Sequence, residues 1–126
     1  MGKLKQRLEN YAVNYSLADN REEKKKQNYK ALTLLRRLFP DKPKRVVKGV
    51  KYYRTARRQS NIVKKNLANF IDTYRELEKD NANNKAKEDC ERNALNFIKN
   101  IFYNNKGAIA KLNNYYLELK HPETAY

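Results

Sequence analysis

The sequence has little of the chemistry on which many enzymes and extracellular domains depend. Its 126 residues include one cysteine, one histidine and no tryptophan. A single cysteine cannot form an internal disulfide, and metal sites built from His or Cys need two or more ligands. No apolar run is longer than four residues, so we expect neither a transmembrane helix nor a signal peptide. These absences favour a protein of the cytoplasm, or one associated with the nucleoid or nucleus.

Turn-forming residues are also scarce, with three glycines and three prolines in the chain. A β-sandwich or barrel would need more, whereas an apolar fraction of 40% and a charged fraction of 34% suit a helical protein. Apolar residues recur at helical spacing, which argues against disorder. We therefore predict an all-α fold, a single compact bundle of five or six helices. One helical domain should span residues 1–120, followed by a C-terminal tail at 121–126.

Two helices are expected before the first proline. The first, at about 3–17, has one apolar stripe that ends at Tyr15. The second should be capped by Asp19, with Glu22 in its first turn, and should end at Phe39 because Pro40 cannot continue it. Its inward side chains are expected to be Tyr29, Leu32, Leu34, Leu35, Leu38 and Phe39.

The rest of the chain predicts further helices. Asp41 can cap the next one and Pro43 suits its first turn. It is followed either by a kink at Gln59–Asn61 or by one continuous helix, because the stripe from Val63 to Leu77 follows with no Gly or Pro between. A helix from about 86 to 102 should end before Gly107. A last helix covers about 109–119.

No catalytic group is evident. His121 precedes a proline near the end of the chain, and Cys90 lies on an inward stripe, where a buried thiol is inert. Asp72 and Glu76 are one helical turn apart on the face opposite the core, which is typical of solvated carboxylates. We predict a protein that is not an enzyme, with no cofactor and no metal site.

What the sequence does have is a block without acidic residues. Between Asp41 and Asp72 there are ten Lys and Arg residues and no Asp or Glu. Residues 1–41 have ten basic and five acidic residues, and residues 72–126 have nine of each. Two thirds of the net charge of +15 therefore lies in 30 residues. A general bias toward lysine would not produce this clustering.

A helical projection separates the block into two faces. Val50 and Tyr53 lie within about 40° of Val46, and all three should face the core. The opposite arc is cationic only, whereas an ordinary exposed face mixes both signs. Phosphate contacts are expected from this arc. Gln59, Asn61 and Tyr52 border it and are candidates to reach bases or sugars, and Tyr52 is a candidate for stacking on an unpaired base. The full predicted site is Lys44, Arg45, Lys48, Lys51, Tyr52, Arg54, Arg58, Gln59, Lys64 and Lys65.

Three functions fit a cationic helix. The first is binding of RNA or DNA, mainly through phosphates, by a subunit of a larger complex. A helix-turn-helix is one form of it, with Lys44 near the start of the recognition helix. The second is docking on an acidic protein partner. The third is a basic membrane-surface domain, for which only the Met1-Gly2 start offers an anchor. The sequence leaves the oligomeric state open.

Overall fold

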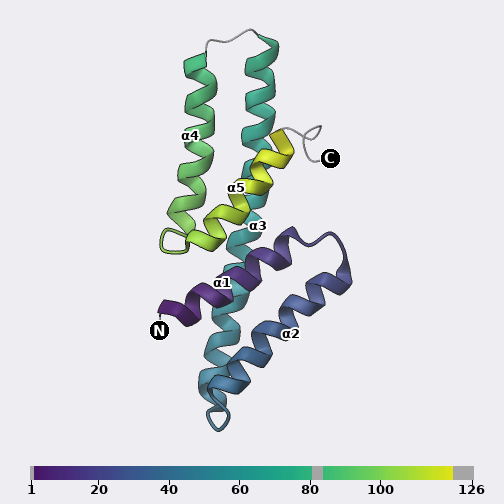
Figure 1. Cartoon of the computed structure of the whole chain (residues 1–126), viewed down its shortest axis with the longest axis vertical. Helices are drawn as coiled ribbons and strands as arrows, with labels where there is room; N and C mark the ends of the chain where they lie inside the picture. The colour runs from purple at the N-terminus through teal and green to yellow at the C-terminus, as the bar shows by residue number, and fades with distance from the viewer. Residues whose placement is uncertain (1, 81–83, 121–126) are drawn as a thin grey trace. The chain divides into compact units, whose positions relative to one another are not determined.

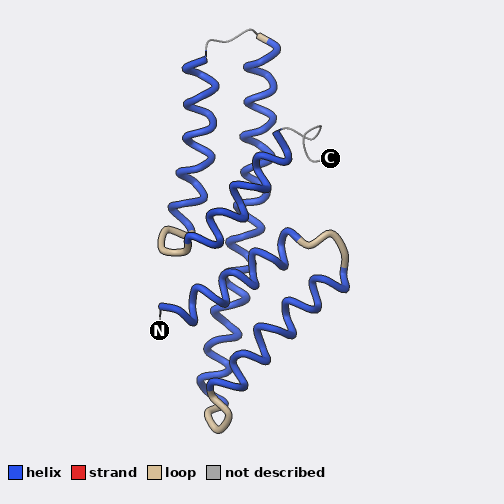
Figure 2. Tube along the Cα trace, in the orientation of Figure 1, coloured by secondary structure: helices blue, strands red, loops and turns tan. Residues whose placement is uncertain are grey.

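The computed structural model describes residues 2–80 and 84–120, and within them the chain forms five α-helices and no strand (Figures 1 and 2). The helices are α1 (Gly2–Leu17), α2 (Arg21–Leu38), α3 (Pro43–Lys79), α4 (Asn84–Ile101) and α5 (Lys106–Lys120). The predicted all-α class and helix number are thus confirmed. The predicted tail at 121–126, with His121, lies outside the described residues.

The chain divides into two compact units, Met1–Asn61 and Ile62–Tyr126, which we call the N-terminal and the C-terminal unit. The first part of α3 belongs to the N-terminal unit and the second part to the C-terminal unit. Of the two alternatives at Gln59–Asn61, the continuous helix is the one observed. Each unit is described by itself below.

The caps of α2 and α3 each lie one residue after the predicted ones. Asn20, and not Asp19, caps α2: its side-chain oxygen accepts a hydrogen bond from the backbone N–H of Glu23 at 2.8 Å. The two neighbours are both good caps, and the one adjacent to the first helical residue has the geometry to reach the third N–H. Likewise α3 begins at Pro43, with the carbonyl of Lys42 accepting from Val46 N, so Asp41 lies outside the helix.

The core of the N-terminal unit forms where α1, α2 and the first part of α3 meet. Its buried side chains are Leu8, Ala12, Ala31, Leu34, Leu35, Tyr53 and Ala56. The predicted face of α2 is partly wrong, because Tyr29 is 71% and Leu38 50% exposed. The helix is turned so that Ala31 faces inward, which places Tyr29 about 160° away at 100° per residue. The prediction was wrong because the large ring of Tyr29 was taken as a sign of burial, whereas the small side chain of Ala31 was not.

Gly49 allows α3 to approach α2 closely. A Cβ added there would overlap the buried side chain of Leu35. Val46 and Val50 pack against the same core, as predicted. The inward face of α3 is therefore anchored on α2, and the opposite face is left to solvent.

The core of the C-terminal unit follows the predicted stripes. Its buried side chains are Val63, Leu67, Ile71, Cys90, Ala94, Ile98, Phe102, Ala108, Leu112 and Tyr116. The turn before α5 differs from the prediction. Gly107 lies in the first turn of α5, and Asn105 caps that helix by accepting from Ala108 N at 3.0 Å.

Candidate nucleic-acid interface

Five predicted phosphate contacts share one exposed face of α3. Lys44, Lys48, Lys51, Arg54 and Arg58 are all exposed, and we call them the cationic row. They fall within about 120° of arc on the helix. Within residues 2–80 and 84–120 none of the five forms an ion pair. The row is therefore a set of like charges on one face of a regular helix.

The row faces away from the rest of its unit because the other side of α3 is engaged. Tyr52 donates a hydrogen bond from its hydroxyl to the carboxylate of Glu9 on α1. Tyr53 donates to Asn28 on α2 at 2.8 Å. With α1 and α2 both held by these residues, the cationic row is left on the solvent side of its own unit.

The remaining predicted site residues are placed in different surroundings. Arg45 and Gln59 are exposed, and the Arg45 guanidinium carbon lies 5.6 Å from the centre of the Phe39 ring. Tyr52 is half-buried, and the ammonium of Lys5 lies 5.5 Å from its ring centre. The Tyr52 ring is thus engaged with α1 and is not presented for stacking on a base.

Lys64 and Lys65 belong to the part of α3 in the C-terminal unit. Lys65 is exposed, whereas Lys64 is half-buried with its ammonium 5.7 Å from the centre of the Tyr115 ring. The structure therefore brings together the row of five with Arg45 and Gln59 on the N-terminal unit. It does not add Tyr52 to that surface.

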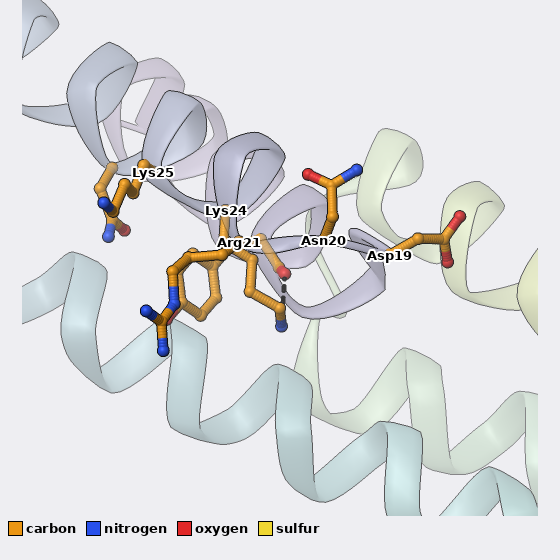
Figure 3. Close-up of a pocket in the computed structure, with 7 residues that line it drawn as sticks. Asp19, Asn20, Arg21, Lys24 and Lys25 are labelled. Atoms are coloured by element: carbon orange, nitrogen blue, oxygen red, sulfur yellow. Dashed lines mark hydrogen bonds between the residues drawn. The ribbon is translucent and has the colours of Figure 1, made fainter.

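Sequence reasoning missed a second group of cations, on α2. A hollow of about 500 Å³ where α1 meets α2 is lined by Tyr15, Asp19, Asn20, Arg21, Lys24, Lys25 and Asn28. Figure 3 shows the side chains of Arg21 and Lys24 extending to the same side, while Asn20 and Asp19 point away from them. Lys24 Nζ donates to the carbonyl of Tyr15 at 3.2 Å and lies 4.8 Å from its ring centre.

Sequence reasoning also missed Arg57, which lies between the cationic row and the core. Its guanidinium carbon is 4.0 Å from the centre of the Tyr15 ring, within the range of a cation–π contact. Its Nη1 donates to Asn28 Oδ1 at 3.2 Å, the same oxygen that accepts from Tyr53. The sequence contains one indication of this role: Arg57 occupies an inward position on the otherwise apolar face of α3.

Burial in this cluster favours the protonated form of Tyr53. Burial raises the pKa of Tyr53 to about 12, although the positive charge of Arg57 acts in the opposite direction. The hydroxyl is therefore a donor at neutral pH, and Asn28 is an acceptor to both α3 side chains. Three side chains from two helices are fixed in this way beside the cationic row.

The chemistry of the C-terminal unit is different. Cys90 is buried, as its stripe predicts, and its thiol donates to the carbonyl of Phe70 at 3.3 Å. Burial raises the pKa of this thiol, which disfavours the reactive thiolate. Lys120 pairs with Glu91, and its ammonium lies 4.4 Å from the Tyr74 ring centre. The carboxylate of Glu91 offsets the charge of Lys120.

The described helices offer neither a metal centre nor a membrane span. No cluster of three or more His, Cys, Asp and Glu side chains suited to hold a metal ion occurs among the described residues. None of the helices in that part of the chain combines the length and the apolar character needed to cross a membrane. Comparison with protein-family models, curated protein sequences and solved structures finds no match.

Proposed function

We propose that this protein binds nucleic acid, RNA or DNA, through the phosphate backbone, without catalysis and as a component of a larger complex. One observation supports the proposal above the others: the cationic row is five exposed charges on a single helical face, without ion pairs in the described part of the chain. Like charges at helical spacing repel, so the arrangement destabilises the free helix. A polyanion removes this cost and releases its own counterions on binding.

The proposal predicts a defined salt dependence. If the five side chains of the row each neutralise one phosphate of a duplex, log K falls against log[salt] with a slope of about −4 to −5. A single strand with the same contacts gives a slope of about −3.5, because its counterion density is lower. Binding to RNA, single-stranded DNA and duplex DNA should therefore be titrated at several salt concentrations.

A charge-reversed variant tests the surface. We expect Lys48→Glu/Lys51→Glu/Arg54→Glu to abolish measurable binding, because it removes three of the five charges and adds three repulsive ones. The matched control is Lys85→Glu/Lys99→Glu/Lys106→Glu, which makes the same change in net charge at exposed lysines of α4 and α5. Equal loss in both variants would show that binding depends on net charge alone and would remove the assignment from α3.

A second candidate partner is an acidic protein. Val47, which is 53% exposed, lies between Lys44 and Lys51 on the same face of α3. An apolar side chain surrounded by cations fits a protein interface, whose centre is less charged than its rim. If the chain binds no nucleic acid at about 0.1 M salt but copurifies with one acidic protein through the row, this second function replaces the first.

A further inference from the structure

We propose that the groove between α2 and the N-terminal part of α3 binds one phosphate group, with Arg57 as its main ligand. This inference rests on the proposed function, since the phosphate would belong to the nucleic acid that crosses the cationic row. The groove lies entirely within the N-terminal unit and has a volume of about 200 Å³. Its floor is apolar and includes Leu35 and Val50, and its polar lining includes Asn28, Arg54 and Arg57.

Arg57 has donors that the described protein does not use. A guanidinium has five N–H donors, and in this one the Nη1 group donates to Asn28. Its Nε is buried and has no hydrogen-bond partner among residues 2–80 and 84–120. Within the same residues Arg57 also forms no ion pair. A half-buried cation with an unused donor is costly, and an anion that accepts from it would remove both costs.

The free edge of the guanidinium suits a phosphate. Because Asn28 engages Nη1, the edge formed by Nε and Nη2 is left over. Two parallel N–H donors of this kind bind two oxygens of one phosphate in the bidentate geometry that favours arginine over lysine. Since Nε is closed to solvent, binding requires a rotation of the guanidinium that turns this edge toward the groove. The contact with Tyr15 fixes the plane from which the rotation starts.

The surroundings of the groove concentrate positive charge. Arg54 belongs to both the cationic row and the groove lining, so a strand lying on the row reaches the groove there. Asn28 lines both the groove and the hollow, which adds Arg21 and Lys24 on the α2 side. Asp19 is the acidic residue of the hollow, and its side chain points away from those of Arg21 and Lys24 (Figure 3).

The direct test follows the Nε–H signal of Arg57 by NMR in the wild-type protein. Inorganic phosphate is titrated against sodium chloride at matched ionic strength, and the signal is assigned with Arg57→Lys. We expect a saturable shift of the Arg57 signal with phosphate and none with chloride. No shift of Arg57, or a shift no larger than that of the exposed Arg58, would overturn the proposal.

Adjacent arginines provide matched variants for the nucleic-acid arm. Arg57→Lys and Arg58→Lys make the same change, one in the groove and one on the row. Arg57→Lys should weaken oligonucleotide binding about tenfold, through loss of a charge-assisted bidentate contact, and Arg58→Lys by less than about twofold. Thermal melting confirms that both variants are folded.

The outcomes separate the two proposals. If the wild-type protein binds oligonucleotide but the Arg57 signal does not move with phosphate or oligonucleotide, the groove site is wrong and the proposed function stands. If phosphate shifts Arg57 saturably and no oligonucleotide binds, the groove site stands and the proposed function is wrong. Equal effects of Arg57→Lys and Arg58→Lys on oligonucleotide binding would also count against the groove.

Discussion

The N-terminal unit has eighteen Lys and Arg residues against five Asp and Glu, whereas the C-terminal unit has eleven against nine. Their net charges are therefore +13 and +2, although the units are similar in length. In the C-terminal unit Arg92 pairs with Asp89 and Lys120 with Glu91. The charge excess of the chain is a property of one unit.

Cations lie over aromatic rings in both units, and in the C-terminal unit Lys120, which lies over Tyr74, also pairs with Glu91. In the N-terminal unit, basic side chains lie over aromatic rings, at 4.0 Å for Arg57 over Tyr15 and 4.8 Å for Lys24 over the same ring. An aromatic face attracts a cation without cancelling its charge, which a carboxylate would do. This arrangement holds cations in place and keeps the surface potential high.

The largest expected effect concerns the core that supports this charge. Leu35→Ala should lower the free energy of unfolding by about 2–5 kcal/mol, because it removes a fully buried side chain from the contact between α2 and α3. Leu38→Ala, on the same helix but half exposed, should change it by less than about 0.5 kcal/mol. Denaturant unfolding measures both. A similar loss in the two variants would mean that Leu38 faces the core, as the sequence predicted.

A smaller effect is expected at Gly49, where α3 approaches α2. Gly49→Ala gains about 1 kcal/mol of helix propensity but forces Leu35 to move, at a cost of about 1–3 kcal/mol. The net result should be destabilisation by about 1 kcal/mol. Gly2→Ala is the control, because a Cβ there has open space. If Gly49→Ala is as well tolerated as Gly2→Ala in thermal melting, the close contact is not rigid.

Two buried tyrosines sharpen the comparison between the units. Tyr53 in the N-terminal unit donates to Asn28, whereas the buried hydroxyl of Tyr116 in the C-terminal unit has no hydrogen-bond partner within the described ranges. Tyr53→Phe should therefore cost about 0.5–1.5 kcal/mol, and Tyr116→Phe should be neutral or stabilising. Chemical denaturation of the two variants gives the answer. The opposite order would show that the hydrogen bond to Asn28 contributes nothing to stability.

The same tyrosines predict a loss of stability in alkali. Burial raises the pKa of Tyr53 from 10.0 to about 12. The unfolded chain therefore loses this proton first, so the contribution is complete below about pH 10 and is lost as the pH rises toward about 12. Tyr53→Phe should flatten the decline in unfolding free energy between about pH 10 and 12. An unchanged slope would mean that Tyr53 does not ionise on unfolding in this range.

Much of the fold could be predicted from the sequence, because the buried residues of a helix recur with the helical period whichever helix it packs against. The stripe of Val63, Leu67 and Ile71 is buried as expected. The errors arose where two neighbouring residues were chemically equivalent, as with Asp19 and Asn20, or where size was mistaken for burial, as with Tyr29. Neither choice can be made without knowing how the helix is rotated.

The candidate site was predictable in part for the same reason. A solvent face without acidic residues can be read from spacing alone, and the cationic row is exposed as that spacing indicates. Arg57 could not be assigned in this way, because its role depends on Tyr15 and Asn28, which are distant in sequence and lie on two other helices. Tyr52 was predicted to stack on a base because it borders the cationic row in the sequence. Its hydrogen bond to Glu9 could not be predicted, because it depends on how α1 packs against α3.

The smallest expected effect is the response of each unit to salt. Self-repulsion of the net +13 destabilises the N-terminal unit, and salt screens it as the Debye length falls from about 30 Å at 0.01 M to about 8 Å at 0.15 M. Amides of α1 and α2 that exchange by local opening should slow about twofold over this range, a change of about 0.4 kcal/mol, while those of α4 and α5 should change little. Hydrogen exchange followed by NMR resolves the two sets. An equal response would mean that the charge difference between the units has no effect on their stability, because the cationic row is already screened by counterions at low salt.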